Sequence, residues 1–485
     1  MKLIRYNILT AALLLTAPLQ GAYAAAVPAT ADPAEDPETV IVEEDEEPTG
    51  EEEIIEEGPE EEDAESDIRE GEVLITSLPD DDDIDIPIPS FIDQSRNHIQ
   101  LNGADWSKLR AAVNSHKIRP LSILNIGDSH IQADFGTGVT RDLLQYKLGN
   151  AGRGIITPLK MSGTNQPYDY VFSSTQPYTA VKLMKAPWRM TMGFTGTSVS
   201  PSTRSSSITV GTRSDDDYDP FSSVTLFHKG QMKVTRVTDE RGADVMFHQH
   251  ASRDYTYIKL GTPQTRVTIY YDNLGDLTLF GANLSGERPG VFYHAIGNNG
   301  ATYDTYNRIG AMGPSIQPLH PDLVIISLGT NEAFGRLDLS RFRNSLDKLV
   351  TDIRTANPDA QILLVTPMEC QRSTTKTVTK RVAVRSKKRK GKKRRTTYKT
   401  VKTKVRTSGV NSNIRPIRDE ILNYGKENGI AVYDWYDVAG GQGASTTWVK
   451  NGLFSPDKIH HSAKGYRLEG RLTYDALMDA FTGKN

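Results

Sequence analysis

Two stretches of the chain alternate between compact apolar runs and apolar residues at helical spacing. The runs 121–126, 322–328 and 362–365 are short and continuous, as is typical of strands buried on both faces. Helical spacing follows, as in the apolar positions over 342–354. Strands that alternate with helices in this way predict an α/β domain, with a parallel sheet between two layers of helices.

The hydrophobic pattern changes between about residues 168 and 284. Short β-rich runs there, such as 266–271, are separated by glycine, proline, aspartate and serine residues. This pattern predicts a β-sandwich inserted over 165–285. The α/β domain would then have two parts, 88–164 and 286–485.

The first residues have the pattern of a secretory signal peptide. Lys2 and Arg5 are followed by a short apolar run over 8–15 and by a small-x-small cleavage site that ends at Ala24. No later apolar stretch is long enough for a transmembrane helix. We therefore predict a signal peptide over 1–24 and an exported protein, periplasmic or secreted, without a transmembrane segment. An uncleaved anchor is the alternative.

Charge is distributed unevenly along the chain. Of the 61 acidic residues, 27 lie within 1–87, which holds only 3 basic residues. The segment 25–87 cannot bury enough apolar surface to offset its ordering entropy, so we expect a disordered acidic tether there.

A basic segment lies in the second half of the chain. Residues 372–406 hold 17 of the 57 lysines and arginines and no acidic residue. Alternating Thr/Lys and Val positions predict a two-stranded hairpin, with a disordered loop as the alternative. The segment is either a solvated extension or an electrostatic contact for an anionic polymer, in which case its tip, Lys387, Lys388, Arg389 and Lys390, would bind substrate. A further hypothesis is that the acidic tether folds back onto it.

Other classes of partner are disfavoured. Export and the absence of a nucleic-acid-binding motif argue against nucleic acid as a partner. Clusters with metal-ligand spacing are missing, and the only cysteine is Cys370. We therefore expect no metal and no organic cofactor, and we interpret Cys370 as a buried, inert thiol.

Ser129 is the first candidate for chemistry. It lies in Gly127-Asp128-Ser129-His130, directly after an apolar run and before a helical pattern. A serine at the carboxyl end of a parallel strand faces the crevice where such sheets bind ligands. The following helix N-terminus offers unpaired N–H groups to a developing oxyanion. The alternative for this triplet is a purely structural N-cap.

A histidine and a carboxylate near the C-terminus complete a possible catalytic set. Asp457 precedes His460 by three residues, a spacing at which the carboxylate can orient the imidazole ring and stabilise its protonated form. His461 is the competing candidate for the base. Asn331 and Gly300 follow two further apolar stretches and could each donate a hydrogen bond to an oxyanion.

In chain order, a GDS block at Ser129, a glycine block at Gly300, a G-x-N-[DE] block at Asn331 and a D-x-x-H block ending at His460 resemble the SGNH (GDSL-like) hydrolase superfamily. The resemblance implies a three-layer α/β/α domain, with Ser129 as nucleophile, His460 as base and Asp457 as the orienting acid. It also implies an oxyanion hole formed by the Ser129 amide, the Gly300 amide and the Asn331 side chain. It covers about 120–160 and 290–480.

The extended first block, from Gly127 to Asp134, is similar to a bacterial subgroup that includes peptidoglycan O-acetylesterases. In that subgroup a β-sandwich resembling a carbohydrate-binding module interrupts the catalytic domain. Glu332 departs from the commoner Asp after Asn331, which is a mild change. The resemblance therefore implies a serine carbohydrate esterase that removes O-acetyl groups from an envelope or extracellular polysaccharide, such as peptidoglycan or another anionic glycan. A sugar O-acyltransferase and a glycan-binding protein with a vestigial site are the alternatives.

Overall fold

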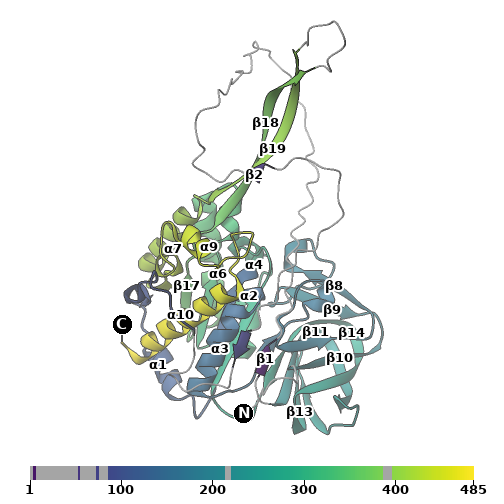
Figure 1. Cartoon of the computed structure of the whole chain (residues 1–485). Coiled ribbons are helices and arrows are strands. Elements are labelled where there is room, and N and C mark those ends of the chain that lie inside the picture. Colours follow the sequence, from purple (N-terminus) through teal and green to yellow (C-terminus); the bar gives the residue numbers. More distant parts are fainter. Residues whose placement is uncertain are drawn as a thin grey trace. The chain divides into compact units, whose positions relative to one another are not determined.

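The computed structural model describes residues 4–6, 53–54, 73–75, 86–212, 220–385 and 396–484. The chain divides into two compact units, which are described separately (Figure 1). The main unit consists of Met1–Ile8, Gly71–Arg372 and Gly409–Asn485, and the hairpin unit of Leu9–Glu70 and Ser373–Ser408. Most of the predicted signal peptide and acidic tether lies outside the described residues.

The hairpin unit contains most of the neighbouring strands β18 (Gln371–Arg385) and β19 (Thr396–Val410). The short strand β2 (Glu53–Ile54) pairs antiparallel with β19, so part of the acidic segment adds a third strand. The predicted substrate-binding tip, Lys387 to Lys390, lies outside the described residues. In the main unit, β1 (Ile4–Tyr6) pairs antiparallel with β3 (Val73–Ile75).

A six-stranded sheet forms the centre of the main unit. Its strands in spatial order are β15 (Val291–Gly297), β5 (Leu121–Gly127), β16 (Leu323–Ser327), β17 (Gln361–Val365), β20 (Ala431–Tyr433) and β4 (Ile99–Gln100). The first five strands are parallel, and β4 is antiparallel to its neighbour. Because β5 lies between β15 and β16, the residues that follow these three strands meet at one edge of the sheet.

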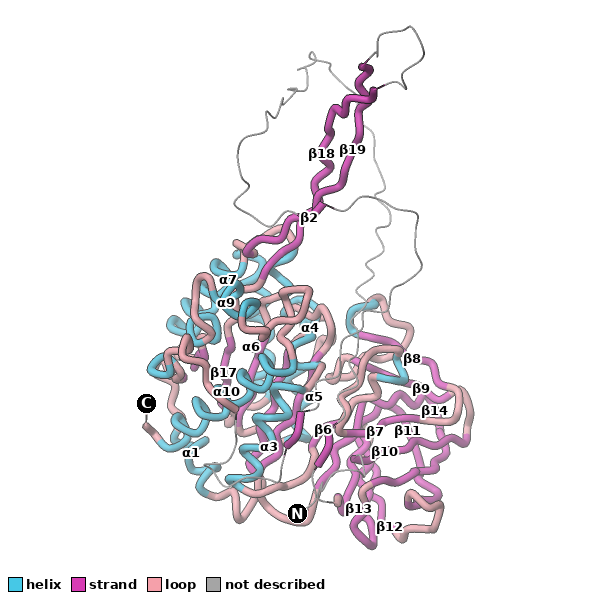
Figure 2. Tube along the Cα trace, in the orientation of Figure 1, coloured by secondary structure: helices cyan, strands magenta, loops and turns pink. Residues whose placement is uncertain are grey.

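Helices pack on both faces of this sheet (Figure 2). One layer is formed by α1 (Ser107–Asn114), α3 (Phe135–Leu148), α8 (Trp435–Val438), α9 (Ala444–Lys450) and α10 (Ala463–Thr482), the other by α4 (Tyr303–Asn307), α5 (Met312–Ile316), α6 (Leu339–Ala356) and α7 (Ile414–Asn428). The short helices are α2 (Ser129–Gln132), η1 (Gln94–Arg96), η2 (Lys160–Ser162), η3 (Leu183–Lys185), η4 (Gln317–Leu319) and η5 (Asn331–Phe334). The predicted three-layer α/β/α fold is confirmed.

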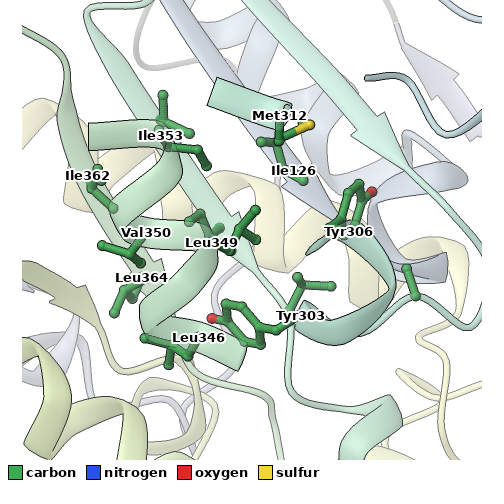
Figure 3. Close-up of a cluster of buried hydrophobic side chains, with 14 of the residues drawn as sticks. Ile126, Tyr303, Tyr306, Met312, Leu346, Leu349, Val350, Ile353, Ile362 and Leu364 are labelled. Carbon is green, nitrogen blue, oxygen red and sulfur yellow. The ribbon is translucent and has the colours of Figure 1, made fainter. Parts of the chain in front are cut away.

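The period-two alternation of β5 explains why both faces are covered. Leu121 and Ile123 belong to the core beneath α10, whereas Leu124 and Ile126 belong to the core beneath α6. Figure 3 shows Ile126 grouped with side chains of α4 and α6, among them Leu349. In the described part of the chain, no helix is both long and apolar enough to cross a membrane.

The segment between α3 and β15 forms a second, nine-stranded sheet. Its strands are β6 (Gly154–Ile156), β7 (Tyr170–Ser173), β8 (Tyr178–Lys182), β9 (Thr197–Pro201), β10 (Ser205–Thr212), β11 (Phe221–Asp239), β12 (Phe247–Ala251), β13 (Tyr255–Gln264) and β14 (Arg266–Ser285). It has its own apolar core. However, Leu183, Met192 and Phe194 belong to the core beneath α6. An independent β-sandwich domain over 165–285 stays a prediction.

A buried network of ion pairs joins this segment to the residues around Ser129. Asp134 accepts hydrogen bonds from Arg141 Nη2 at 2.7 Å and from Arg153 Nη2 at 2.6 Å. Arg153 Nε lies 2.5 Å from Asp169 Oδ2, close to the start of β7. Burial alone would raise the pKa of Asp134, but the two guanidinium groups hold this pKa below its ordinary value. Each charge in the network therefore depends on the others for its compensation.

The substitution Asp134→Asn is expected to lower the free energy of unfolding by about 3–5 kcal/mol, because it leaves Asp169 as the one remaining paired carboxylate for two buried arginines. Asp244→Ala is the matched control: Asp244 pairs with Arg236 at 2.6 Å, but their side chains are 74% and 51% exposed, and the expected loss is below about 1 kcal/mol. Denaturant unfolding of both variants measures the difference. Equal losses would contradict a structural role for the network.

Candidate active site

Ser129 begins α2 immediately beyond the end of β5. Asp128 caps this helix, since its carboxylate accepts a hydrogen bond from the His130 N–H at 2.9 Å. The Ser129 side chain is nearly buried. The Ser129 N–H has no acceptor among the described residues, as expected at the first turn of a helix. The strand-to-helix turn thus presents a serine hydroxyl and an unused donor together.

Two glycines permit α2 to pack this closely on the strand ends. A Cβ atom on Gly127 would lie 2.3 Å from Ile131 Cγ1 and 2.8 Å from the Ser327 carbonyl oxygen. A Cβ atom on Gly297 would lie 2.0 Å from the backbone nitrogen of Gln132. Both distances involving backbone atoms are far inside van der Waals contact, so any side chain here would displace α2 and Ser129.

His460 and Asp457 approach Ser129 from the loop that precedes α10. Ser129 Oγ lies 2.8 Å from His460 Nε2, and His460 Nδ1 lies 2.6 Å from Asp457 Oδ2. The other Asp457 oxygen accepts the N–H groups of Ile459 and His460 at 2.9 and 3.0 Å. Burial alone would raise the pKa of Asp457, but these bonds keep that pKa below its ordinary value. The three predicted residues thus form a continuous hydrogen-bonded chain.

His461 contacts a different carboxylate. Its Nδ1 lies 3.2 Å from Glu469 Oε2, and its ring packs among aromatic side chains such as Trp448. His130 lies between the two histidines, with ring centroids 5.2 Å from His460 and 5.3 Å from His461. Burial, and then the charge that either neighbour would carry, lowers the pKa of His130 well below its ordinary value. His130 is therefore a neutral neighbour of the ring that contacts Ser129.

The predicted oxyanion donors follow the two strands that flank β5. Gly300 lies in the turn after β15, at φ +81°, where glycine is favoured. Its N–H has no acceptor among the described residues. Asn331 Nδ2 lies 3.0 Å from Asp128 Oδ2 and 3.0 Å from the Ala301 carbonyl oxygen. Both hydrogens of this amide are thus engaged, and Asn331 could donate to an oxyanion only by sharing or releasing one of them.

Two carboxyl groups beside these donors have raised pKa values. Burial raises the pKa of Asp128 to about 6 and that of Glu332 to about 7. Glu332 Oε1 accepts the Tyr303 N–H at 2.9 Å. The sequence analysis did not predict that Glu332 would accept the Tyr303 N–H or that Gln132 would accept the Asn299 N–H. Both residues lie inside motifs that it singled out. Their partners come from distant parts of the chain, so spacing alone gives no signal.

The remaining candidate groups contribute little to this site. Burial raises the pKa of Cys370 to about 12, which leaves its thiol protonated. In the described part of the chain, no group of three His, Cys, Asp or Glu residues could hold a metal ion.

The second part of the chain matches a known protein family. Residues 270–468 match the model of the GDSL-like lipase/acylhydrolase family. A solved structure of a peptidoglycan O-acetylesterase superposes with a TM-score of 0.59 at 20% identity, over 81% of this chain and 98% of that one. A lipase/acylhydrolase from Enterococcus faecalis, at 18% identity, covers 39% of this chain and 77% of its own with a TM-score of 0.26. No curated protein matches the chain.

The family match covers the blocks around Gly300, Asn331 and His460, and the peptidoglycan O-acetylesterase shares the fold over most of the chain. Ser129, directly after the end of β5, supplies the first block. Residues 270–468 therefore form a GDSL-like lipase/acylhydrolase domain, the kind of domain found in SGNH hydrolases that cleave ester bonds, and the fold of the chain is similar to that of a peptidoglycan O-acetylesterase.

Proposed function

We propose that this protein is an exported serine esterase that removes O-acetyl groups from a cell-envelope polysaccharide, with peptidoglycan as the first candidate substrate. The observation that carries the proposal is the chain of hydrogen bonds from Ser129 Oγ through His460 to Asp457. Similarity to a peptidoglycan O-acetylesterase over 98% of that protein supports the choice of substrate. The signal-peptide pattern over 1–24 supports export.

In the first step, His460 Nε2 takes the proton of Ser129 Oγ as this oxygen attacks the ester carbonyl carbon. Asp457 orients the ring and stabilises the imidazolium that forms. The negative charge on the carbonyl oxygen is held by the N–H groups of Ser129 and Gly300, with the Asn331 amide as the third donor. The sugar alkoxide leaves with the proton from His460, and Ser129 carries the acetyl group.

In the second step, water replaces the sugar. His460 removes a proton from the water as its oxygen attacks the acetyl carbonyl carbon, and the same donors hold the second oxyanion. Collapse of this intermediate breaks the bond to Ser129 Oγ, which recovers its proton from His460. Acetate is released and the enzyme returns to its starting state.

Acetate release from O-acetylated peptidoglycan by the mature protein tests the proposal. Ser129→Ala and His460→Ala are each expected to lower the rate by about 10⁴-fold or more, since the triad acts as one unit. His461→Gln is the matched control and should keep most of the activity, because its ring contacts Glu469 and not Ser129. Full activity in the His460 variant together with loss in the His461 variant would move the base to the second histidine.

Asn331→Ala is expected to lower kcat by about 10²–10³-fold while leaving measurable turnover, because two backbone donors remain. KM should change much less, since the oxyanion exists only after attack. Steady-state kinetics with a small aryl acetate measure both constants. A rise in KM at unchanged kcat would assign Asn331 to substrate binding instead.

The basic segment 372–406 is proposed to recruit the substrate. Its base contacts the loop that contains Asp457, since the Gln371 N–H donates to the Lys458 carbonyl oxygen at 2.9 Å. The Asn411 N–H donates to the Cys370 carbonyl oxygen at 2.9 Å and so joins the two ends of the hairpin. Lys458 follows Asp457 directly. A cationic extension rooted here would increase the local concentration of an anionic glycan near Ser129.

Replacing residues 372–406 by a short Gly-Ser linker should therefore weaken turnover of the polymer far more than turnover of an aryl acetate. Substituting the four tip residues, Lys387, Lys388, Arg389 and Lys390, by glutamine should give a smaller loss in the same direction, and added salt should reduce the difference. Initial rates on both substrates provide the measurement. Equal losses on the polymer and the small ester would reject the proposed role.

A further inference from the structure

In the turn around Gly300, all the backbone N–H groups except one form hydrogen bonds within the described structure. From Asn298 to Tyr303, five of the six N–H groups donate within the described structure. The acceptors are Gly127 O for Asn298, Gln132 Oε1 for Asn299, Asn298 O for Ala301, Thr305 Oγ1 for Thr302 and Glu332 Oε1 for Tyr303. The N–H of Gly300 alone has no acceptor among the described residues, although its two neighbours in the chain are fixed.

One side of this turn is held by Gln132. Its Oε1 accepts the Asn299 N–H at 2.7 Å, and its Nε2 donates to Asn165 Oδ1 at 2.7 Å and to Thr164 Oγ1 at 3.1 Å. The Gln132 side chain is buried. It projects from α2, the helix that begins with Ser129. Gln132 thus links the helix of the nucleophile directly to the residue before Gly300.

The other side of the turn is held by η5, which follows β16. Glu332 Oε1 accepts the Tyr303 N–H at 2.9 Å, and the preceding Asn331 donates to the Ala301 carbonyl oxygen at 3.0 Å. Glu332 Oε2 is buried and lacks a hydrogen-bond partner in the described structure. Asn331 and Glu332, which are consecutive in η5, therefore hydrogen-bond to the backbone directly after Gly300.

We propose that Gln132 and Glu332 are positioning residues that fix the Gly300 N–H, and through α2 the Ser129 N–H, at the separation that an oxyanion requires. The inference rests on the proposed esterase function and deepens it. Oxyanion donors act only when they lie about 2.7–3.1 Å from the developing charge, and a displacement of about 1 Å can cost about 10²-fold in rate. Neither side chain has to touch the substrate to produce this effect.

Both residues also stabilise the fold, so the test has to separate positioning from stability. Matched controls exist for each. Gln145 Nε2 donates to the carbonyl oxygens of Gly152 and Val291, at the amino end of β15, and Asp352 accepts the Gly313 N–H at 2.8 Å. Like Gln132 and Glu332, these side chains form hydrogen bonds with backbone groups, but away from the strand ends that carry the site.

The experiment compares Gln132→Ala and Glu332→Ala with Gln145→Ala, Asp352→Ala and the isosteric Glu332→Gln in the full-length mature protein. Steady-state kinetics with a small aryl acetate give kcat and KM, and thermal unfolding gives Tm. Amide hydrogen exchange of the peptide over 298–303 reports the order of the turn without using activity. Wild type and Ser129→Ala are measured alongside, which tests the proposed function independently.

We expect kcat to fall by about 10- to 100-fold in Gln132→Ala and Glu332→Ala, with KM changed less than about threefold and with faster exchange over 298–303. Glu332→Gln should restore most of kcat and the slow exchange, because its carbonyl oxygen can still accept the Tyr303 N–H. The two control variants should lower Tm by similar amounts and keep wild-type kcat.

The inference is overturned if hydrogen exchange over 298–303 is unchanged in Gln132→Ala and Glu332→Ala. It is overturned as well if the control variants lose as much kcat as these two variants. It is also overturned if Glu332→Gln is as impaired in kcat and exchange as Glu332→Ala, since the carboxylate charge and not the accepted bond would then matter. If wild type and Ser129→Ala are equally inactive, the proposed function fails, and the exchange data alone still decide whether the two side chains hold the turn.

Discussion

The whole site depends on how closely α2 packs on the ends of β5 and β15. In the parallel register Gly127 lies opposite both Gly297 and Ser327, so the three segments that follow these strands start at the same level. The absence of a side chain at Gly127 and Gly297 lets α2 cross the strand ends within van der Waals contact. Ser129, Gly300 and Asn331 come from different parts of the chain and converge for this reason.

The electrostatics of the site follow from the same close packing. Asp128 is buried under α2, where it accepts the His130 N–H and the Asn331 amide, and burial raises its pKa to about 6. The neutral His130 ring packs near His460. Asp457 contacts the Nδ1 atom of the His460 ring, on the side away from Ser129. Negative charge is thus placed where it stabilises an imidazolium.

Much of this arrangement could be predicted from the sequence because it is encoded locally. Apolar runs indicated the parallel strands, and Ser129, Asn331 and Asp457 each lie within a short motif next to such a run or in the terminal loop. The roles of Gln132 and Glu332 could not be predicted, because their partners, Asn299 and Tyr303, are distant in the chain. These contacts depend on which residues are buried next to each other in the fold, and the periodicity of apolar residues in the sequence does not show this.

The nine-stranded sheet illustrates a second limit of sequence patterns. Short β-rich runs predicted strands over 165–285, and strands occur there. The pattern gave no sign that Leu183 and Phe194 pack into the core beneath α6, or that Arg153 and Asp169 extend the ion pairs of Asp134. The sequence pattern does not distinguish an apolar side chain that packs into the core of a neighbouring region from one that packs within its own region. It likewise does not distinguish a charged residue paired in the interior from one at the surface.

Covalent labelling is the most direct test of Ser129 as the nucleophile and His460 as its base. The mature protein would be treated with an aryl fluorophosphonate, digested, and mapped by mass spectrometry, with His460→Ala treated in parallel. If Ser129 is the nucleophile and His460 is its base, a single adduct forms on Ser129, and labelling is slower by orders of magnitude in the variant. Inactivation with the adduct on another residue, or equal labelling of Ser129 in the two proteins, would contradict it.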